Sequence, residues 1–486
     1  MIKQFNWKIS GAAGEGIKIA GMILAKTAFR SGYYVHGYTE YPSLIRGGVN
    51  TFQVNASTSP VFSQSDKFNL ELSLKDKDFA PPKNISALGY SCAKLGLSLK
   101  TLLVVIQEVF ADKSKPVIEL NLKAAKKAYQ ACPSPAEPVK LKPLNKKIII
   151  SGNEAVALGA VAGGLQVFIA YPMTPTTTIL HVLAANASRL NLNVHHAEDE
   201  IGVINMAIGA AYSGRRVMVA TSGGGFDLMT EGLGLAAISE TPIVIVLGMR
   251  PGPATGMPTW SSQGDLLMAI NSSQDEFPRI VLTPGDCDEA FQAGKQAQIL
   301  AQKYRLPVII LIDKNLGESI YTADLFPNEH QFLNFPQPPK PYLANSYEHN
   351  NEGLATETSA ERTKQVNRRL LKFSQVLKDS ISPQLYGPKN ASKTLISWGS
   401  NKGPILEALK SLKNTSFIHF PWLWPFPKNK FLNLVNLKST LFSLECNATG
   451  QLAKLIAQET GLKIKNQVLK YDGRPFYPSE IINALC

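Results

Sequence analysis

The feature that most constrains this fold is an alternation of short apolar runs with helical stretches that begins near Lys147. Six runs are rich in β-branched and aromatic residues: QVFIAY (166–171), NVHHAE (193–198), RVMVATS (216–222), PIVIVLGM (242–249), RIVLTP (279–284) and PVIILID (307–313). Apolar strands joined through helices are typical of a parallel sheet covered on both faces. The sequence therefore predicts a doubly wound α/β domain over residues 148–335.

The stretches on either side predict further units of an α/β protein. At 486 residues the chain has room for about three domains. Residues 1–140 are expected to form an N-terminal α/β domain, and residues 141–147, which end a proline-spaced stretch, a linker. Residues 336–392 contain scattered Pro, His and Asn and then a charged helix, which indicates a connection on the surface. The runs TLISWGS (394–400), FIHF (417–420) and TLFSLEC (440–446) predict a smaller α/β domain over 393–486.

The net charge of +13 is unevenly distributed and does not by itself indicate nucleic-acid binding. Residues 1–147 carry 21 Lys and Arg against 10 Asp and Glu, residues 148–335 carry 9 against 17, and residues 336–486 carry 20 against 10. No zinc-finger spacing, RNA-binding aromatic motif or arginine stripe accompanies the lysines, so we expect no nucleic-acid partner. A basic flank could instead meet an acidic protein.

Membrane insertion, secretion and metal binding are not expected of this chain either. The longest uncharged stretch (155–188) is broken by glycines and Pro172, whereas a membrane span needs about 20 apolar residues. The start MIKQFNWKIS has no long apolar run behind its lysines, so no secretory signal is predicted and the cytoplasm is the expected compartment. The five cysteines lie far apart without a Cys-x-x-Cys pair, which argues against a zinc or iron–sulfur site.

A glycine-rich turn, GAAGEG (11–16), follows the first predicted strand and precedes a helical pattern. Such a turn can present backbone N–H groups to an anion, or it can serve only close packing of strand and helix. A dinucleotide fingerprint would need glycine where Ala13 stands, and a P-loop would need Gly-Lys-Ser/Thr where Ile17 and Lys18 follow Gly16. These failures favour the packing interpretation.

The ends of the central strands are where a doubly wound sheet binds its ligands. Four unusual segments stand there: YPMTPTT (171–177), EDE (198–200), SGGG (222–225) and RPGPATG (250–256). Glu200 opens an apolar helix, and a carboxyl in such a setting can keep a proton and share it with a ligand nitrogen. The alternative is that residues 198–200 only favour the helix N-terminus electrostatically.

Arg250, in a proline-stiffened loop, has the chemistry of a bidentate carboxylate or phosphate clamp. Thr174 lies between two prolines and offers a hydroxyl, although turn formation explains it equally well.

The motifs taken together resemble a known family. GNEAVALGAVAGG, YPMTPTT, AEDEIGVINMAIGAAYSG, TSGGGFDLMTEGLGLA and RPGPATGMPT, in this order, resemble the alpha subunit of the 2-oxoacid:ferredoxin oxidoreductases, which use thiamine diphosphate. GAAGEGI with EYPSLIRGG (40–48) resembles that family's gamma subunit, fused here ahead of alpha, and the tail YDGRPFYPSEI (471–481) is similar to the end of such chains. The resemblance thus covers nearly the whole length. It implies a gamma-type N-terminal domain, a central domain that binds the pyrimidine of thiamine diphosphate, and a smaller C-terminal α/β domain.

The resemblance also implies roles for individual residues. Glu200 corresponds to the glutamate that hydrogen-bonds the aminopyrimidine of thiamine diphosphate, and Tyr171 and Pro172 to residues beside that cofactor. Thr174 and Arg250 correspond to the residues that hold the substrate's carboxylate. The chain lacks Gly-Asp-Gly and a cysteine cluster, so Mg²⁺ and the [4Fe-4S] cluster are expected on a separate beta subunit. Three departures are Gly224 in place of proline, Pro251 in place of a second glycine and Ala254 in place of serine.

The implied reaction converts a 2-oxoacid, coenzyme A and oxidised ferredoxin to acyl-coenzyme A, carbon dioxide and reduced ferredoxin. 2-Oxoglutarate is the first candidate substrate, because of the fused gamma–alpha arrangement, and pyruvate and branched-chain 2-oxoacids are the alternatives. A rival interpretation is a chain of the same fold that serves as a docking or regulatory subunit without turnover. The presence of Thr174, Glu200 and Arg250 argues against that rival.

Overall fold

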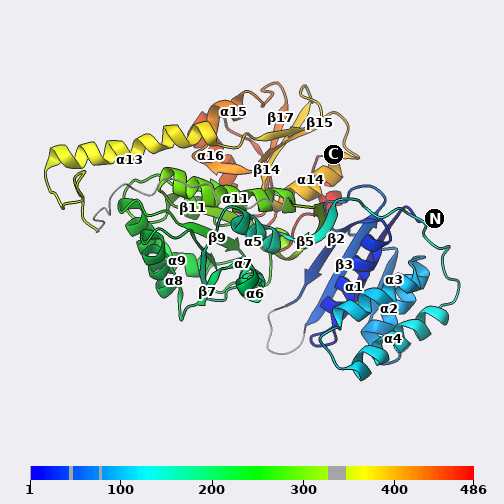
Figure 1. Ribbon diagram of the computed structural model, residues 1–486. Coiled ribbons are helices and arrows are strands. Elements are labelled where there is room, and N and C mark those ends of the chain that lie inside the picture. Colours follow the sequence, from blue (N-terminus) through cyan, green and yellow to red (C-terminus); the bar gives the residue numbers. More distant parts are fainter. Residues whose placement is uncertain (1, 43–47, 76–78, 327–345, 486) are drawn as a thin grey trace.

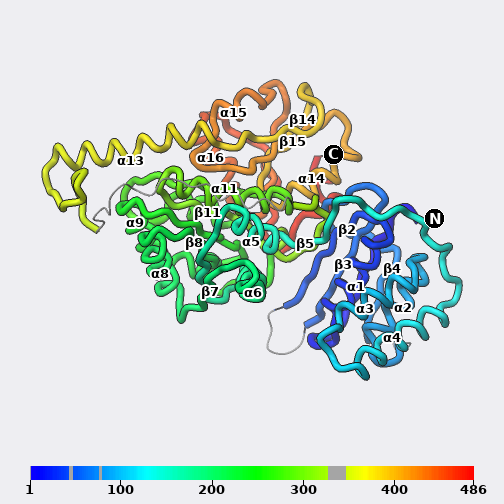
Figure 2. The backbone as a smooth tube through the Cα atoms, in the orientation of Figure 1, coloured from blue at the N-terminus to red at the C-terminus, as the bar shows by residue number. Residues whose placement is uncertain are grey.

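Three β-sheets with their helices build the protein (Figures 1 and 2). The structure is a computed structural model that describes residues 2–42, 48–75, 79–326 and 346–485. Residues 43–47 of the EYPSLIRGG motif and residues 327–345, on both sides of the predicted boundary at 335/336, lie outside the described residues. None of the helices within the described ranges is both long and apolar enough to cross a membrane.

The central sheet has seven strands in the order β16-β10-β11-β9-β8-β6-β7. Each of the six predicted apolar runs contains one strand, and these six are mutually parallel: β6 (Val167–Ala170), β7 (Asn193–His196), β8 (Val217–Ser222), β9 (Val244–Met249), β10 (Ile280–Leu282) and β11 (Val308–Asp313). The seventh, β16 (Trp422–Trp424), comes from the C-terminal part of the chain and pairs antiparallel with β10. The local apolar pattern therefore located this sheet but not its last strand.

Helices cover both faces of the central sheet, as doubly wound topology requires. They are α5 (Gly152–Ala162), α6 (Thr177–Ala185), α7 (Ala187–Leu190), α8 (Glu200–Tyr212), α9 (Gly223–Ile238), α10 (Leu266–Asn271), α11 (Cys287–Tyr304) and α12 (Lys314–Glu318). Alternate residues of β9 face opposite sides, so that Val246 packs in the α5–α11 core and Ile245 in the α8–α9 core. Gly159 lets α5 approach α11 closely, because a Cβ there would lie 2.0 Å from the Phe291 carbonyl oxygen.

The N-terminal sheet has the order β4-β1-β3-β2-β12-β5. Its strands are β1 (Gln4–Ala12), β2 (Tyr34–Glu40), β3 (Val49–Ser57), β4 (Leu70–Ser73), β5 (Lys147–Ser151) and β12 (Ile320–Asp324), and its helices are α1 (Ile17–Arg30), α2 (Lys83–Lys94), α3 (Leu99–Val109) and α4 (Lys115–Gln130). Strands β5 and β12, which flank the central sheet in sequence, extend this sheet: β12 pairs antiparallel with β2, and β5 pairs antiparallel with β12. The predicted linker 141–147 runs into β5, which already begins at Lys147.

The glycine turn between β1 and α1 is closed by its own side chain. Glu15 accepts a hydrogen bond from the Ala12 backbone N–H at 2.6 Å through Oε2. Gly16 adopts a positive φ of 75° as it enters α1. Because a carboxylate of the chain already occupies this amide, the contact agrees with the packing interpretation of the turn.

The C-terminal sheet has the order β13-β15-β14-β17-β18. Its strands are β13 (Gln384–Tyr386), β14 (Lys393–Trp398), β15 (Thr415–Phe420), β17 (Thr440–Glu445) and β18 (Asn466–Leu469), with α14 (Lys402–Leu409), α15 (Lys428–Leu432), α16 (Gln451–Thr460), α17 (Pro478–Leu485) and a 3₁₀ turn (Gly399–Asn401). The charged helix expected in the connecting segment is α13 (Ser359–Asp379), which passes beside α11 and extends beyond the central domain (Figure 1).

Candidate functional site

The four segments singled out at the strand ends lie at the carboxyl edge of the central sheet. The loop 171–176 follows β6, residues 197–199 lead from β7 into α8, β8 runs directly into α9, and the proline-rich loop follows β9. Because β6, β7, β8 and β9 are parallel neighbours, their carboxyl ends lie along one edge. This edge is the candidate active site.

Glu200 differs sharply from the two acidic residues before it. Glu198 and Asp199 are exposed, and Asp199 caps α8 by accepting a hydrogen bond from the Gly202 backbone N–H at 2.6 Å. Glu200 is only 5% exposed, and its buried Oε1 has no hydrogen-bond partner among the described residues. An unpaired buried carboxyl oxygen costs free energy, which indicates a polar group that is supplied from outside the chain.

Gly225, in the first turn of α9, makes room for that carboxyl. A Cβ at position 225 would lie 2.6 Å from Glu200 Oε1 and 2.1 Å from Thr221 Oγ1. Gly224, where the family resemblance leads one to expect proline, has open space instead, because a Cβ there would meet no atom within 4 Å. The SGGG segment therefore holds one glycine that the Glu200 side chain requires and one that it does not.

Arg250 and Thr174 meet at the ends of β9 and β6. The Nη1 atom of Arg250 donates a hydrogen bond of 2.9 Å to the backbone carbonyl of Thr174, not to its hydroxyl. Burial lowers the pKa of Arg250, while the charges of Asp265 and Glu200 act in the opposite direction. Arg250 therefore shares an electrostatic environment with Glu200, and the loop that carries Thr174 holds one edge of its guanidinium group.

The 171–176 loop is itself fixed by buried contacts. Asn153, near the start of α5, donates from Nδ2 to the Pro175 carbonyl at 2.7 Å, and Thr176 Oγ1 donates to the Met173 carbonyl at 3.0 Å. Gly248 in β9 permits this packing, because a Cβ there would lie 2.5 Å from Thr176 Cγ2. These contacts preorganise the backbone carbonyl to which Arg250 binds.

Tyr171 and Pro172 precede that carbonyl at the mouth of the loop. Tyr171 is exposed, with its ring centroid 6.3 Å from that of His196 at the end of β7, and Pro172 is half-buried. Both precede Thr174 in the same loop, and no hydrogen bond or ring contact among the described residues joins either of them to Glu200.

A cavity of about 550 Å³ opens beside Arg250, between the central and C-terminal domains. Arg250, the 251–254 loop and Asp265 line one side, and Asn447 and Gln451 line the other. Sequence reasoning did not single out Asp265, Asn447 or Gln451. Asp265 lies only fifteen residues beyond Arg250 in SSQGDLL, but a lone aspartate after a loop carries no local signal. The contributions of Asn447 and Gln451 depend on packing of a distant domain.

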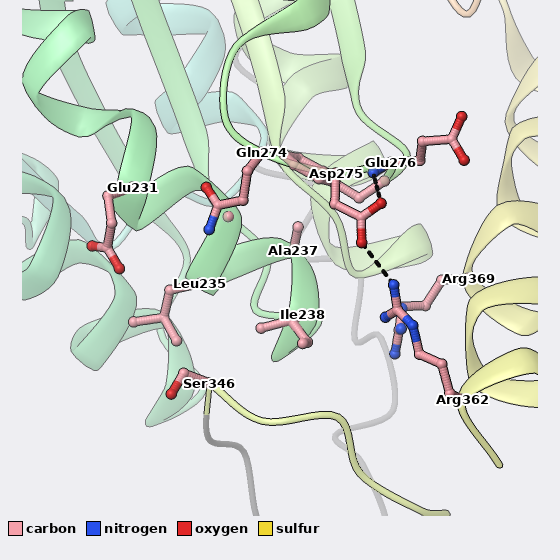
Figure 3. Close-up of a pocket in the computed structure, with 12 residues that line it drawn as sticks. Glu231, Leu235, Ala237, Ile238, Gln274, Asp275, Glu276, Ser346, Arg362 and Arg369 are labelled. Atoms are coloured by element: carbon pink, nitrogen blue, oxygen red, sulfur yellow. Dashed lines mark hydrogen bonds and ion pairs between the residues drawn. The ribbon is translucent and has the colours of Figure 1, made fainter. Parts of the chain in front are cut away.

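A second, smaller pocket of about 190 Å³ lies between α9, residues 274–277 and the start of α13 (Figure 3). Its two arginines are already paired, Arg362 with Asp275 at 2.6 Å and Arg369 with Glu348 at 2.6 Å. Arg362 also contacts Glu348 at 2.7 Å. This cluster fastens α13 to the central domain, and its arginines are not available as an anion site.

Comparison with known proteins agrees with the architecture. Residues 158–375 match the family described as pyruvate flavodoxin/ferredoxin oxidoreductase, thiamine diP-binding, and residues 6–77 match pyruvate ferredoxin/flavodoxin oxidoreductase. The solved 2-oxoglutarate:ferredoxin oxidoreductase from Magnetococcus marinus, which holds 2-oxoglutarate, coenzyme A and succinyl-CoA, superposes with a TM-score of 0.89 and 29% identity over 100% of this chain and 99% of that one. The fold is thus that of an oxidoreductase subunit with a thiamine diphosphate-binding domain.

Curated relatives place the chain more narrowly. The 2-oxoacid:ferredoxin oxidoreductase alpha subunit of a Sulfolobus species is 29% identical over 99% of this chain and 96% of its own length. The alpha subunit of 2-oxoacid:ferredoxin oxidoreductase 2 of Aeropyrum pernix is 32% identical over 80% and 69%, and the 2-oxoglutarate oxidoreductase subunit KorA of Mycobacterium tuberculosis is 32% identical over 83% and 68%. The chain belongs to the alpha subunits of the 2-oxoacid:ferredoxin oxidoreductases. The family and fold class predicted from the motifs are therefore confirmed.

Proposed function

We propose that this chain is a fused gamma–alpha subunit that converts a 2-oxoacid and coenzyme A to acyl-coenzyme A and carbon dioxide and passes the electrons to ferredoxin. The observation that carries the proposal is the buried Oε1 of Glu200, which has no hydrogen-bond partner among the described residues and lies at the carboxyl edge of the sheet. Glu200 is also close enough to Arg250 to act on its charge. 2-Oxoglutarate is the first candidate substrate, because the Mycobacterium tuberculosis relative is named for it and the Magnetococcus marinus structure contains it. Pyruvate and branched-chain 2-oxoacids are the alternatives.

Glu200 is the residue that fits the aminopyrimidine of thiamine diphosphate. A buried carboxyl without a partner suits a heteroaromatic ring nitrogen, with which it can share a proton. When bound, thiamine diphosphate supplies the carbanion chemistry of the reaction. The task of Glu200 is to hold the shared proton at its Oε1, and Tyr171 and Pro172 are proposed to border the cofactor from the preceding loop.

Arg250 and Thr174 are proposed to anchor the carboxylate of the 2-oxoacid. The Thr174 carbonyl holds Nη1 of Arg250, and the described residues supply no second hydrogen-bond partner to the guanidinium group. The remaining N–H donors are thus available for a bidentate interaction with a carboxylate, and the Thr174 hydroxyl can add a further hydrogen bond. A substrate that is anchored in this way has lost its rotational freedom before its 2-carbonyl group reacts.

The rest of the cofactor site is proposed to lie on a beta subunit that carries Mg²⁺ and the [4Fe-4S] cluster. Among the described residues, no group of three or more His, Cys, Asp or Glu side chains could hold a metal ion, and the four described cysteines are buried as free thiols. The docking face is proposed to be the outer side of α8 and α9, at the end of the central domain away from the N-terminal sheet (Figure 1). Ile201, Met206 and Leu228 are about half exposed there, and Gly209 leaves open space for a close approach.

The test is 2-oxoacid-dependent reduction of a viologen dye by the complex of this chain with its beta subunit, prepared under anaerobic conditions. We expect coenzyme A-dependent turnover with one of three substrate classes, 2-oxoglutarate, pyruvate or branched-chain 2-oxoacids. The chain without its partner is the matched control and should be inactive. A correctly assembled complex without turnover on any of them would instead identify a docking or regulatory subunit.

Arg250→Lys tests the carboxylate anchor in the same assay. Lysine keeps the charge but cannot bind a carboxylate in a bidentate manner, and loss of one charge-assisted hydrogen bond costs about 1.5–3 kcal/mol, or roughly 10- to 100-fold in kcat/KM. We expect a higher KM and a lower kcat/KM. Wild-type kinetics in this variant would contradict the anchor assignment.

A further inference from the structure

The cavity beside Arg250 contains an acidic group that the proposed reaction does not use. Asp265 lies on the cavity wall, and its Oδ2 is buried without a hydrogen-bond partner among the described residues. The carboxyl group lies against the start of α9, because a Cβ at Gly223 would be 3.2 Å from this oxygen. No salt bridge joins Asp265 to Arg250 within the part of the chain that the structure describes. An acid placed beside an anion-binding cation, yet not paired with it, needs an explanation.

The backbone around Asp265 is held rigidly by the C-terminal domain. On one side, Gln263 Oε1 accepts hydrogen bonds from the Cys446 backbone N–H at 2.9 Å and from Asn401 Nδ2 at 2.8 Å. On the other side, Gln451 donates to the Gly264 carbonyl at 2.6 Å and accepts from the Leu267 backbone N–H at 2.9 Å. These four bonds bracket Asp265 and fix the backbone on both sides of it.

Several titratable groups around the cavity influence the charge of Asp265 or of Arg250. Burial raises the pKa of Asp265 to about 6, Asp227 on α9 adds to this effect, and Arg250 opposes it. Glu200 on α8 also acts on Arg250, and Tyr471 from the C-terminal tail lines the cavity. Asp227 is exposed, so solvent and salt screen its charge more strongly than that of Asp265.

We propose that Asp265 sets the affinity of the site for carboxylates, because its negative charge opposes an anion bound at Arg250 and its protonation removes that opposition. The inference rests on the assignment of Arg250 as the carboxylate anchor. Asp265 acts through the local field without touching the substrate, which makes it a positioning residue. Weaker binding of the ground state does not by itself lower kcat, since binding that is equally strong in the ground state and the transition state does not raise it.

The sign of the pH effect follows from the like charges. A carboxylate at Arg250 disfavours the ionised form of Asp265, so binding of the anion is linked to uptake of a proton. Affinity should therefore increase as the pH falls through about 6. If the bound anion raises the pKa of Asp265 by one unit, the affinity at low pH exceeds that at high pH by about tenfold.

The experiment titrates oxamate, an unreactive 2-oxoacid mimic whose carboxylate stays ionised, into the assembled complex by calorimetry at pH 5.5, 6.5 and 7.5. Wild type should bind oxamate up to about tenfold more tightly at pH 5.5 than at pH 7.5. Asp265→Asn should bind it at every pH with the affinity that wild type reaches at pH 5.5. Asp227→Asn is the matched control, and it should keep most of the pH dependence because Asp227 is exposed.

Two results would overturn the inference. A wild-type Kd that does not change between pH 5.5 and 7.5 would do so, and this measurement needs no variant. Weaker binding of oxamate by a folded Asp265→Asn protein would also do so, because it would mean that the carboxylate supports binding. Arg250→Lys separates this inference from the proposed function: if that variant binds oxamate with an unchanged Kd, the anchor itself is wrong, whatever Asp265 does.

Discussion

Gly225 should be the glycine of the SGGG segment that cannot be replaced without disturbing the site. It lies in the first turn of α9, and the Cβ of an alanine would come within 2.1 Å of Thr221 Oγ1 and 2.6 Å of Glu200 Oε1. Thr221 is fully buried in β8 and is β-branched, so it cannot easily rotate away. Gly225→Ala should therefore displace the Glu200 carboxyl or strain β8.

The size of the effect follows from two opposing terms. An alanine in a helix gains up to about 1 kcal/mol over glycine, and excess volume in a packed core costs about 1–3 kcal/mol. Gly224→Ala, one residue earlier in the same turn, gains the first term without the second, because its Cβ would meet no atom within 4 Å. The helix term is shared, so the two variants should differ by the packing term, about 1–3 kcal/mol.

The assay compares the two alanine variants with wild type in thermal unfolding under identical conditions, followed by thiamine diphosphate titration of the assembled complex. Gly224→Ala should unfold at or above the wild-type temperature and bind the cofactor normally. Gly225→Ala should unfold below Gly224→Ala and bind the cofactor more weakly. Equal behaviour of the two variants would refute the argument that α9 packs on Glu200 as described.

Three further changes test other parts of the structure. Glu200→Gln keeps the size of the side chain but removes the shareable proton, so the complex should still bind thiamine diphosphate while exchange of its C2 proton slows by about 10²-fold or more; wild-type exchange, followed by NMR, would reduce Glu200 to a helix-end carboxylate. Glu348→Gln removes the ion pairs with Arg362 and Arg369 and should destabilise the attachment of α13 by about 1–3 kcal/mol. The measurement is limited proteolysis of residues 346–379, which should become faster. The exposed control Glu352→Gln should show no change. Burial disfavours the charge of Glu348, but hydrogen bonds from Arg369 and Arg362 outweigh this effect and hold the pKa of Glu348 at about 2. The stabilisation from these ion pairs is therefore complete above about pH 4.5 and is lost as the pH falls towards 2. Resistance to proteolysis that stays constant over this pH range would contradict the pairing.

The parts of the fold that could be predicted from the sequence are those with a local pattern. Each of the six apolar runs in the central domain contains a parallel strand flanked by helices. Five of these strands are largely buried, whereas β7 lies at the edge of the sheet and is mostly exposed. Strands β5 and β12 could not be assigned to the N-terminal sheet, since their pairing joins segments that are far apart in sequence: Ile320 lies opposite both Gly37 and Ser151. Likewise, only packing of the C-terminal domain brings β16 to the edge of the central sheet.

The sequence also predicted part of the candidate site, namely the residues that stand in recognisable motifs. The motifs pointed to Glu200, Arg250 and Thr174, but three consecutive acidic residues do not tell which of them faces inwards. The inward position of Glu200 uses space left by Gly225 in another helix, where a Cβ would lie 2.6 Å from Glu200 Oε1. The contact between Arg250 and Thr174 uses a backbone carbonyl, which a sequence cannot distinguish from a side-chain hydroxyl. The segment that carries Asp265 is held through Gln263, whose side chain accepts hydrogen bonds from Asn401 and Cys446, more than 130 positions away.

The balance of charge at the site suggests why assembly matters for binding of the substrate. Arg250 is the one basic side chain among the described residues that line the cavity beside it, whereas Asp227 and Asp265 are acidic and Glu200 lies close enough to act on Arg250. This agrees with the excess of acidic over basic residues in 148–335, 17 against 9. A single guanidinium surrounded by carboxyl groups attracts an anion weakly, because the opposing charges partly cancel its field. A substrate with two carboxylates needs still more positive charge. Under the proposed function, we therefore expect strong binding of a 2-oxoacid to require cations from a partner subunit.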